Sequence, residues 1–268
     1  MAWSMTGEGA GRATRVAVRA FLIGIGLLVI WQAAILIFRP PPFMLPPPAD
    51  VAGVLVARPD LWRVHAVATL SASLAGLLIG GLVGMALALA MSFLPVSRRL
   101  LLPVLVVSQA VPVFAIAPLL VLWFGFGIAS KIVMTTIAIF FPVTSAYADG
   151  LRRTDPGLLD IAQLYRASRW QTVTLLRMPS ALPSLVTGLR LAAVYAPVGA
   201  LIGEWVGSTS GLGYVMLFAN SRAQTDVMFA ALALVIAMSV ILRAIVDLLT
   251  ANLVPWAPET VTSDERRE

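Results

Sequence analysis

Residues 149–183 read DGLRRTDPGLLDIAQLYRASRWQTVTLLRMPSALP, which is the longest polar interruption between the apolar stretches of the chain. Asp155 followed by Pro156 predicts a helix start, because aspartate caps the first backbone N–H groups and proline fits the first helical position. Ser168 and Gln171 fit a capping box that begins a second helix, running toward the next proline. The segment is therefore predicted to form two short helices that make a compact protrusion.

The first of these helices is predicted to be amphipathic, with apolar residues on one face and polar residues elsewhere. The apolar positions are Leu158, Ile161, Ala162 and Tyr165, and the polar ones are Gln163, Arg166 and Arg169. Such a helix can cover the ends of its own bundle, lie on a membrane surface or dock in the groove of a partner. The residues alone leave these alternatives open.

The sequence on both sides of this segment is that of a polytopic membrane protein. Of 268 residues, 59% are hydrophobic and 12% charged, and the mean hydropathy is +0.92, which excludes a soluble globular chain. A helix that crosses the bilayer needs about 20 apolar residues. The expected fold class is an all-α integral membrane protein with six transmembrane helices, at residues 20–38, 67–93, 100–123, 131–148, 182–205 and 227–249.

Two of these spans carry signals about packing. Proline removes a backbone donor, so the third span is predicted to be kinked or bent at its ends by Pro103, Pro112 and Pro118. In the second span glycine recurs every fourth residue, at positions 76, 80 and 84. This stripe favours the close approach of another helix, and a flexible gate is the alternative.

The arginines predict the orientation, because cationic residues concentrate in cytoplasmic loops. One side of the predicted topology holds Arg12, Arg15, Arg19, Arg98, Arg99, Arg152, Arg153, Arg166, Arg169, Arg177, Arg266 and Arg267, and the other holds Arg39, Arg58, Arg63, Lys131 and Arg222. Both termini are therefore predicted to be cytoplasmic. The expected parts are an N-terminal segment 1–19, a six-helix domain 20–250 that contains the loop 149–183, and a tail 251–268.

Two outer features precede the second span. Residues 39–50, RPPPFMLPPPAD, are predicted to form an extended strap, because a high proline density favours extended backbone over helix. A short interfacial helix is predicted near residues 60–64. The first span is expected to be an uncleaved helix, because its apolar run is longer than that of a signal peptide.

The composition leaves little for catalysis or metal binding. The chain has no cysteine, and His65 is its only histidine, so neither a thiolate or zinc site nor a histidine-based triad is expected. It lacks the G-x-x-x-x-G-K-[ST] phosphate loop of ATPases, and no basic patch interleaved with aromatics indicates nucleic acid. No catalytic residue, metal or cofactor of its own is expected, and no nucleic-acid partner.

The run from Asp160 to Arg190, DIAQLYRASRWQTVTLLRMPSALPSLVTGLR, resembles the EAA loop of the permeases of binding-protein-dependent ABC importers. The family pattern is Glu-Ala-Ala, three residues, Gly, nine residues, Ile, one residue and Leu-Pro. The spacing is kept, with residues 160–162 in the first three positions and residues 178–179 in the last two. Arg166 stands at the glycine, where it would cost about 1 kcal/mol if the turn needs a positive φ.

Further motifs extend the resemblance over residues 40–250. WFGFGIASK at residues 123–131, and GEW at 203–205 followed by GLG at 211–213, are similar to the taurine, sulfonate and nitrate permease branch. QAVPVFAIAPLLVLWFGFG at 109–127 and DGLRRTDP at 149–156 resemble hydroxymethylpyrimidine or thiamine-precursor permeases within that branch.

The resemblance implies a type I ABC importer permease fold with cytoplasmic coupling helices, in a bacterial inner membrane and in contact with its lipid. It implies separate ATPase subunits that bind ATP and magnesium, an extracytoplasmic solute-binding protein, and a second permease subunit, identical in the expected homodimer. The chain itself is then not an enzyme. The residues expected to dock on the ATPase are Asp160, Ile161, Ala162, Gln163, Tyr165, Arg166, Ala167, Ser168 and Arg169.

The expected solute is a thiamine-precursor pyrimidine, and taurine, sulfonate or nitrate are the alternatives for the same architecture. A neutral aromatic solute needs polar and stacking groups in an otherwise apolar passage. The candidates are Ser108, Gln109, Phe114, Trp123, Tyr195 and Glu204. A secondary transporter is the alternative class, but it needs ionisable residues near the bilayer centre, and the acidic residues of the spans lie toward their ends.

Charged residues within the spans have further interpretations. Glu204 beside Trp205 is either an interfacial residue with an aromatic anchor or a contact for the substrate or the binding protein. Arg243 and Asp247 are four residues apart and are predicted to form an ion pair. Arg190 is expected to serve helix packing.

Overall fold

The computed structural model describes residues 6–254 and 256, without the side chains of residues 6–17, 19–21, 95 and 98. The secondary structure in this part is helical throughout. The helices are α1 (Thr6–Phe38), α2 (Pro48–Ala57), α3 (Pro59–Phe93), α4 (Pro95–Ala110), α5 (Val113–Phe124), α6 (Ile128–Arg152), α7 (Pro156–Leu164), α8 (Arg169–Gln171), the π-helix η1 (Thr172–Arg177), α9 (Met178–Gly207), α10 (Leu212–Ser221), α11 (Thr225–Thr250) and the 3₁₀-helix η2 (Ala251–Leu253).

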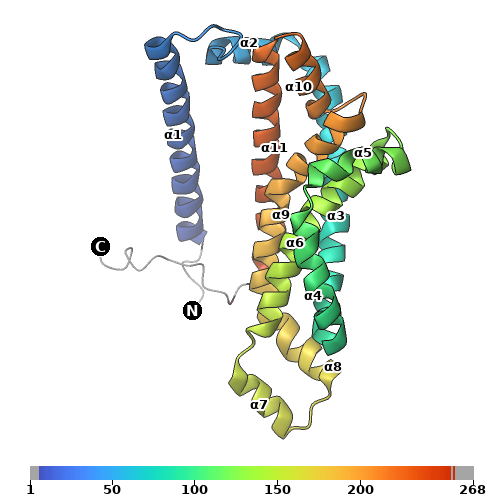
Figure 1. Ribbon diagram of the computed structural model, residues 1–268. Coiled ribbons are helices and arrows are strands. Elements are labelled where there is room, and N and C mark those ends of the chain that lie inside the picture. Colours follow the sequence, from blue (N-terminus) through green and yellow to red (C-terminus); the bar gives the residue numbers. More distant parts are fainter. Residues whose placement is uncertain (1–5, 255, 257–268) are drawn as a thin grey trace.

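The helices α3, α6, α9 and α11 form an elongated bundle with α6 packed between α3 and α9 (Figure 1). α2 and α10 lie at one end, called here the α10 end, and α7 projects from the other, the α7 end. α1 runs beside the bundle and is joined to it through α2. The ring of Trp31 on α1 also lies 5.3 Å from that of Phe229 on α11.

The glycine stripe of α3 lies against α6, as the sequence predicted. A Cβ on Gly76 would overlap the side chain of Thr135, one on Gly80 would lie 2.7 Å from Ile139, and one on Gly84 would lie 2.7 Å from the carbonyl oxygen of Phe140. Side chains larger than hydrogen would separate the two helices. The packing interpretation of the stripe is therefore confirmed.

The described helices confirm part of the predicted set of spans. Four are long and apolar enough to cross a membrane by themselves: Pro59–Phe93, Ile128–Arg152, Arg169–Gly207 and Thr225–Leu253. α4 and α5 together can make a fifth, whereas the apolar part of α1, Leu22–Phe38, is shorter. The count of six is thus not confirmed, although a helix lies at each of the six predicted positions.

The third predicted span is broken, as its prolines indicated. α4 and α5 meet at an angle of 97°. The break falls at Val111 and Pro112, where the backbone is extended, while Pro103 and Pro118 lie inside helices. Pro112 is the proline at the break, and Val111 before it has the extended backbone that the clash with a following proline ring favours.

The outer strap is shorter than predicted. A turn at residues 42–44 follows α1, and helix α2 already begins at Pro48. Proline suits this first helical position, because the N–H group that it lacks has no partner there. The short helix predicted near residues 60–64 is not separate either but is the first part of α3. The indole of Trp62 donates to the carbonyl of Val54, 3.1 Å away, and ties α3 to α2.

The prediction of two short helices in residues 149–183 is correct for α7 and wrong for the second. α8, η1 and α9 form one continuous helix, Arg169–Gly207. The π-helical turn at residues 172–177 precedes Pro179, which lies in the first turn of α9. A widened turn is one way in which a helix accommodates a residue that lacks a backbone donor, so the proline does not end the helix.

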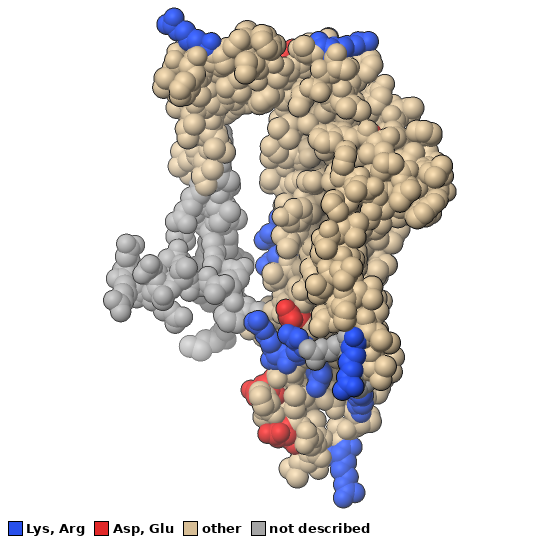
Figure 2. Space-filling model, viewed as in Figure 1, with Lys and Arg blue, Asp and Glu red and all other residues tan. Residues whose placement is uncertain are grey.

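On the face that Figure 2 shows, most charged side chains lie at the two ends of the bundle, and the broad band between them is largely uncharged. This band is the surface expected to face lipid. Residues 257–268 of the expected tail, with the arginines at 266 and 267, lie outside the described residues.

Candidate functional site

The protrusion at the α7 end is fixed by two helix caps. The carboxylate of Asp155 accepts a hydrogen bond of 2.7 Å from the N–H of Gly157. Ser168 and Gln171 form the predicted capping box: the serine hydroxyl accepts from the N–H of Gln171 at 3.2 Å, and the glutamine oxygen accepts from the N–H of Ser168 at 2.8 Å. Both predicted caps are confirmed.

The turn between α7 and α8 places Arg166 in the left-handed region, with φ 50°. The N–H of Ala167 donates to the carbonyl of Ala162 at 2.8 Å, and the N–H of Arg166 donates to that of Gln163 at 2.9 Å. This pair of bonds defines a Schellman motif, whose left-handed position is usually glycine. The turn does need a positive φ at this position, so the arginine is strained.

The surface of α7 is largely apolar and open. Ile161 is 54% exposed, and Leu164 and Tyr165 are each 80% exposed, whereas Ala162 is buried. Asp160, Gln163 and Arg166 are exposed too. Arg169 instead turns back toward α3, and its Nη2 donates to the carbonyl of Ser92 at 3.4 Å. The predicted docking residues thus lie on one protruding element, except that Arg169 points to the bundle.

The α10 end holds a cluster of buried polar groups, named here the loop clamp: His65, Thr69, Lys131, Glu204 and the backbone of residues 210–213. Glu204 is 1% exposed and Lys131 is 4% exposed. One carboxylate oxygen of Glu204 accepts from the hydroxyl of Thr69 at 2.8 Å, and the other accepts from the N–H of Gly213 at 2.8 Å. Glu204 is therefore enclosed by protein in this chain.

The remaining bonds of the loop clamp fasten the loop before α10. The hydroxyl of Thr69 accepts from the N–H of Leu212 at 2.8 Å, and Nδ1 of His65 accepts from the N–H of Gly211 at 3.0 Å. Nζ of Lys131 donates to the carbonyl of Ser210 at 3.0 Å. Such partners are required, because a buried polar group without one costs about 1–3 kcal/mol.

The two glycines of the GLG motif fit this clamp. Gly211 has φ 121°, and a Cβ there would overlap the carboxylate of Glu204. A Cβ on Gly213 would lie 2.7 Å from the carbonyl oxygen of Leu201. The motifs GEW and GLG thus contact each other directly, with the carboxylate of Glu204 packed against Gly211 and hydrogen-bonded to Gly213.

The sequence interpretation did not single out Thr69, and it placed His65 and Lys131 in no site. A signal was present, since these are the only histidine and the only lysine of the chain and a buried charge needs a partner.

The other candidates for the substrate path lie on accessible faces. Phe114 and Trp123 on α5 are 55% and 67% exposed, and Tyr195 on α9 is 49% exposed. On α4, Nε2 of Gln109 lies 3.5 Å from the hydroxyl of Ser108. Among the described residues, no other hydrogen bond or ring contact joins these side chains, and Glu204 lies apart from them in the loop clamp.

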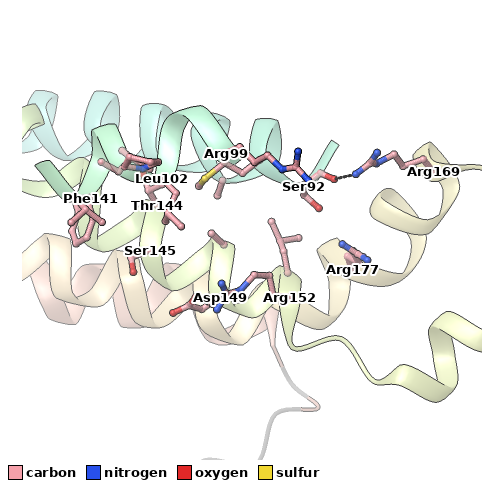
Figure 3. Close-up of a pocket in the computed structure, with 17 residues that line it drawn as sticks. Ser92, Arg99, Leu102, Phe141, Thr144, Ser145, Asp149, Arg152, Arg169 and Arg177 are labelled. Carbon is pink, nitrogen blue, oxygen red and sulfur yellow. Dashed lines mark hydrogen bonds and ion pairs between the residues drawn. The ribbon is translucent and has the colours of Figure 1, made fainter. Parts of the chain in front are cut away.

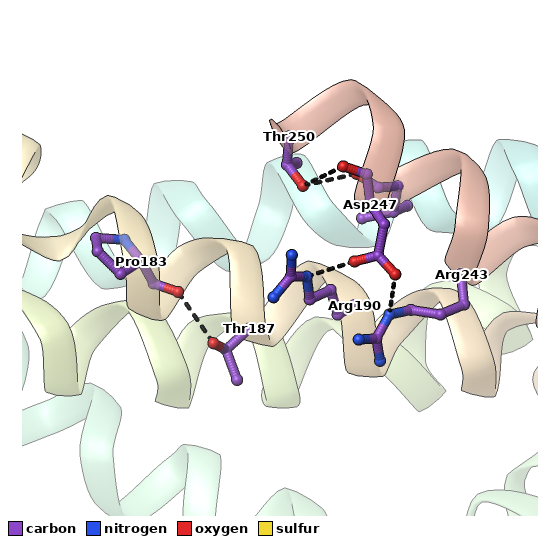
Figure 4. Close-up of polar contacts among 7 residues, drawn as sticks. Pro183, Thr187, Arg190, Arg243, Asp247 and Thr250 are labelled. Atoms are coloured by element: carbon purple, nitrogen blue, oxygen red, sulfur yellow. Dashed lines mark hydrogen bonds and ion pairs between the residues drawn. The ribbon is translucent and has the colours of Figure 1, made fainter. Parts of the chain in front are cut away.

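Asp247 lies between two arginines (Figure 4). Its Oδ2 accepts from Nε of Arg243 at 2.8 Å, which confirms the predicted pair. Nε of Arg190, on α9, lies 2.6 Å from Oδ1, an ion pair whose angles are not those of a hydrogen bond. The ion pair of Arg190 with Asp247 therefore links α9 to α11.

A cavity of about 670 Å³ opens between α3, α4 and α6 near the α7 end. Four arginines gather toward one end of it, and Leu102 and Phe141 lie at the other (Figure 3). The arginines are Arg99, Arg152, Arg169 and Arg177. No site was predicted from the sequence at this position.

Comparison with known proteins identifies the family to which this fold and these motifs belong. Residues 76–257 match the family described as the binding-protein-dependent transport system inner membrane component. A probable ABC transporter permease of Haemophilus influenzae is 47% identical over 236 residues, 88% of this chain and 96% of the relative. The riboflavin transport permease RibX of Chloroflexus aurantiacus is 36% identical, covering 86% and 87% of the two chains.

The formylaminopyrimidine transport permease ThiX of Halalkalibacterium halodurans is 34% identical, over 86% of this chain and 92% of its own. Among solved structures, the inward-facing MetNI methionine ABC transporter matches with a TM-score of 0.61 at 17% identity, over 70% of this chain and 94% of that one. The fold is thus that of type I ABC importer permeases. The chain belongs to the family of inner membrane components of binding-protein-dependent transport systems and is an ABC importer permease.

Proposed function

We propose that this chain is the membrane-spanning subunit of an ATP-driven importer that moves a thiamine-precursor pyrimidine, delivered by an extracytoplasmic binding protein, into the cell. The observation that carries the coupling part is the open apolar surface of α7, formed by Ile161, Leu164 and Tyr165. Apolar side chains grouped on a protruding helix mark a surface for a partner. Membership in the permease family supports a separate ATPase, which binds ATP and magnesium, as that partner, and the sequence itself has no phosphate-binding loop.

The continuous helix Arg169–Gly207 gives this contact a mechanical consequence. Its capping box at Ser168 begins four positions after Leu164, the last residue of α7. At its other end lies Glu204, which is bonded to Thr69 on α3. A displacement of α7 by the ATPase would therefore move α9 as a rigid body, and with it the helices that α9 packs against. The arginines near α7 support a cytoplasmic position for that end.

A second permease subunit completes the proposed assembly. Each chain carries one α7, so two ATPase subunits require two permease chains, and an identical chain is the simplest second subunit. Phe114, Trp123 and Tyr195 are accessible in one chain. We infer that these side chains, with Ser108 and Gln109, line a path between the two copies, where aromatic faces and an amide could guide a planar solute.

The substrate proposal is supported by the relatives. RibX and ThiX, at 36% and 34% identity, are named for two nitrogen heterocycles, riboflavin and formylaminopyrimidine. Both solutes contain a planar ring system with hydrogen-bonding edges, and the candidate path combines aromatic rings with amide and hydroxyl groups. A pyrimidine therefore suits these side chains.

Reconstituted transport tests the proposal. The permease would be placed in proteoliposomes with its ATPase and binding protein, and uptake of labelled formylaminopyrimidine and hydroxymethylpyrimidine compared with that of taurine. We expect ATP-dependent uptake of a pyrimidine and none by the permease alone. Uptake of taurine, a sulfonate or nitrate instead would establish the alternative substrate class, and uptake driven by a proton gradient without ATPase would contradict the coupling mechanism.

A further inference from the structure

The cavity between α3, α4 and α6 is amphipathic. Its apolar part includes Leu102, Val106 and Phe141, and its polar end holds Arg99, Arg169 and Arg177 (Figure 3). The volume of about 670 Å³ is that of a site for a small molecule. A ligand with one anionic and one apolar part would match this lining.

The charge in the cavity is not balanced by the described residues. Asp149 is the one acidic residue in the lining, and it pairs with Arg152 at 3.0 Å. None of the described residues forms an ion pair with Arg99, Arg169 or Arg177. Three guanidinium groups around one space favour an anion, and arginine matches the geometry of phosphate oxygens.

Two buried polar atoms in the same lining also have no partner in the described part of the chain. Ser92 is 9% exposed and its hydroxyl makes no hydrogen bond; Nε of Arg177 is buried and likewise makes none. Buried donors are almost always satisfied. Both residues line the arginine-rich end, so a bound oxyanion there would accept from them.

The position of the cavity indicates the source of the anion. Arg99 directly precedes the apolar run of α4, and Arg152 is the last residue of α6. Side chains at the ends of apolar helices lie at the level of lipid headgroups, and basic pockets between helices on the cytoplasmic side suit anionic headgroups.

We propose that this cavity binds the phosphate headgroup of an anionic membrane lipid through Arg99, Arg177 and Ser92, with part of an acyl chain against Leu102 and Phe141. The proposal is independent of the transported solute, because it concerns the permease alone and its binding of lipid. The bound lipid would fasten α4 to η1, next to the base of the α7 protrusion.

Native mass spectrometry of the full chain, titrated with dioctanoyl phosphatidylglycerol, dioctanoyl phosphatidylcholine and inorganic phosphate, tests the proposal. We expect phosphatidylglycerol to bind at least tenfold more tightly than the other two. The double variant Arg99→Gln/Arg177→Gln should weaken its binding about tenfold or more, and Arg177→Lys, which keeps the charge, should weaken it less. Arg63→Gln, an exposed arginine at the α10 end, is the matched control and should change nothing.

Ser92→Ala is the variant that keeps the test valid if the double variant does not fold, and it should weaken phosphatidylglycerol binding about threefold. Equal binding of the two lipids, or unchanged binding in both the double variant and Ser92→Ala, would overturn the proposal. If inorganic phosphate binds as tightly as phosphatidylglycerol, the cavity is a site for a free anion and the lipid proposal is wrong. Lost copurification of the ATPase with unchanged lipid binding would assign the arginines to that partner instead.

Discussion

The two ends of the molecule differ in whether their buried polar groups have partners within the chain. At the α10 end, Glu204 and Lys131 are buried, and the loop clamp gives each a partner within the chain. At the α7 end, apolar side chains of α7 face outward and the hydroxyl of Ser92 lies buried without a partner among the described residues. The buried polar groups of the first end are satisfied within one chain, whereas the second end has the features of a surface that other molecules complete.

This difference predicts where substitutions destabilise the fold and where they only disturb association. A change in the loop clamp should lower the free energy of unfolding, because the groups left behind are buried. A change on the outer face of α7 should leave folding intact, because little is lost when an exposed side chain is replaced.

The largest effect is expected for Gly211→Ala. The residue has φ 121°, and the new Cβ would overlap the carboxylate of Glu204. Backbone strain and overpacking each cost about 1–3 kcal/mol, so we expect a loss of about 4 kcal/mol, measured as a lower thermal unfolding temperature of the purified chain in detergent. Gly53→Ala is the control, because no atom lies within 4 Å of its Cβ; equal stability of both variants would contradict the clamp.

Glu204→Ala should follow, with a loss of about 3 kcal/mol. It leaves the N–H of Gly213 and the hydroxyl of Thr69 without their buried acceptor, and each such group costs about 1–3 kcal/mol. The same thermal measurement applies, with the exposed Asp50→Ala as control. If Glu204→Ala unfolds at the temperature of the unmodified chain, the carboxylate does not hold the loop.

Leu164→Asp tests the other end. The side chain is 80% exposed, so the unfolding temperature should stay nearly constant, while the amount of ATPase that copurifies with the permease should fall about tenfold. The cause is a charge placed in an apolar interface. Val56→Asp on α2, an 81% exposed position at the α10 end, should retain the ATPase. Full retention in Leu164→Asp would mean that α7 is not the docking element.

The smallest effect is expected for Arg166→Gly. Glycine removes the strain of the left-handed conformation but gains freedom in the unfolded chain, so the net gain for the end of α7 should be about 0.5 kcal/mol. Hydrogen exchange of the Ala167 amide, which is bonded to Ala162, should slow about twofold. Arg166→Ala keeps the strain and should not slow it; the same slowing in both variants would point to the loss of the arginine side chain instead.

Local signals explain which predictions were confirmed. The caps at Asp155 and Ser168, the break at Pro112 and the pair Arg243–Asp247 depend on residues at most four positions apart. In each case the interacting groups belong to neighbouring residues or to residues one helical turn apart, so the local backbone conformation alone brings them together. The resemblance of residues 160–190 to a known loop added the family, which the comparisons confirm.

The sequence by itself determined that the chain is an all-helical membrane protein, where most of its helices lie and which loop protrudes, because hydrophobic length and capping are properties of neighbouring residues. Only the tertiary structure decided that Glu204 meets Thr69, 135 positions away, that Arg190 reaches Asp247, and that separate arginines enclose one cavity. These contacts join different helices and depend on how those helices pack. A pattern of neighbouring residues therefore cannot predict them.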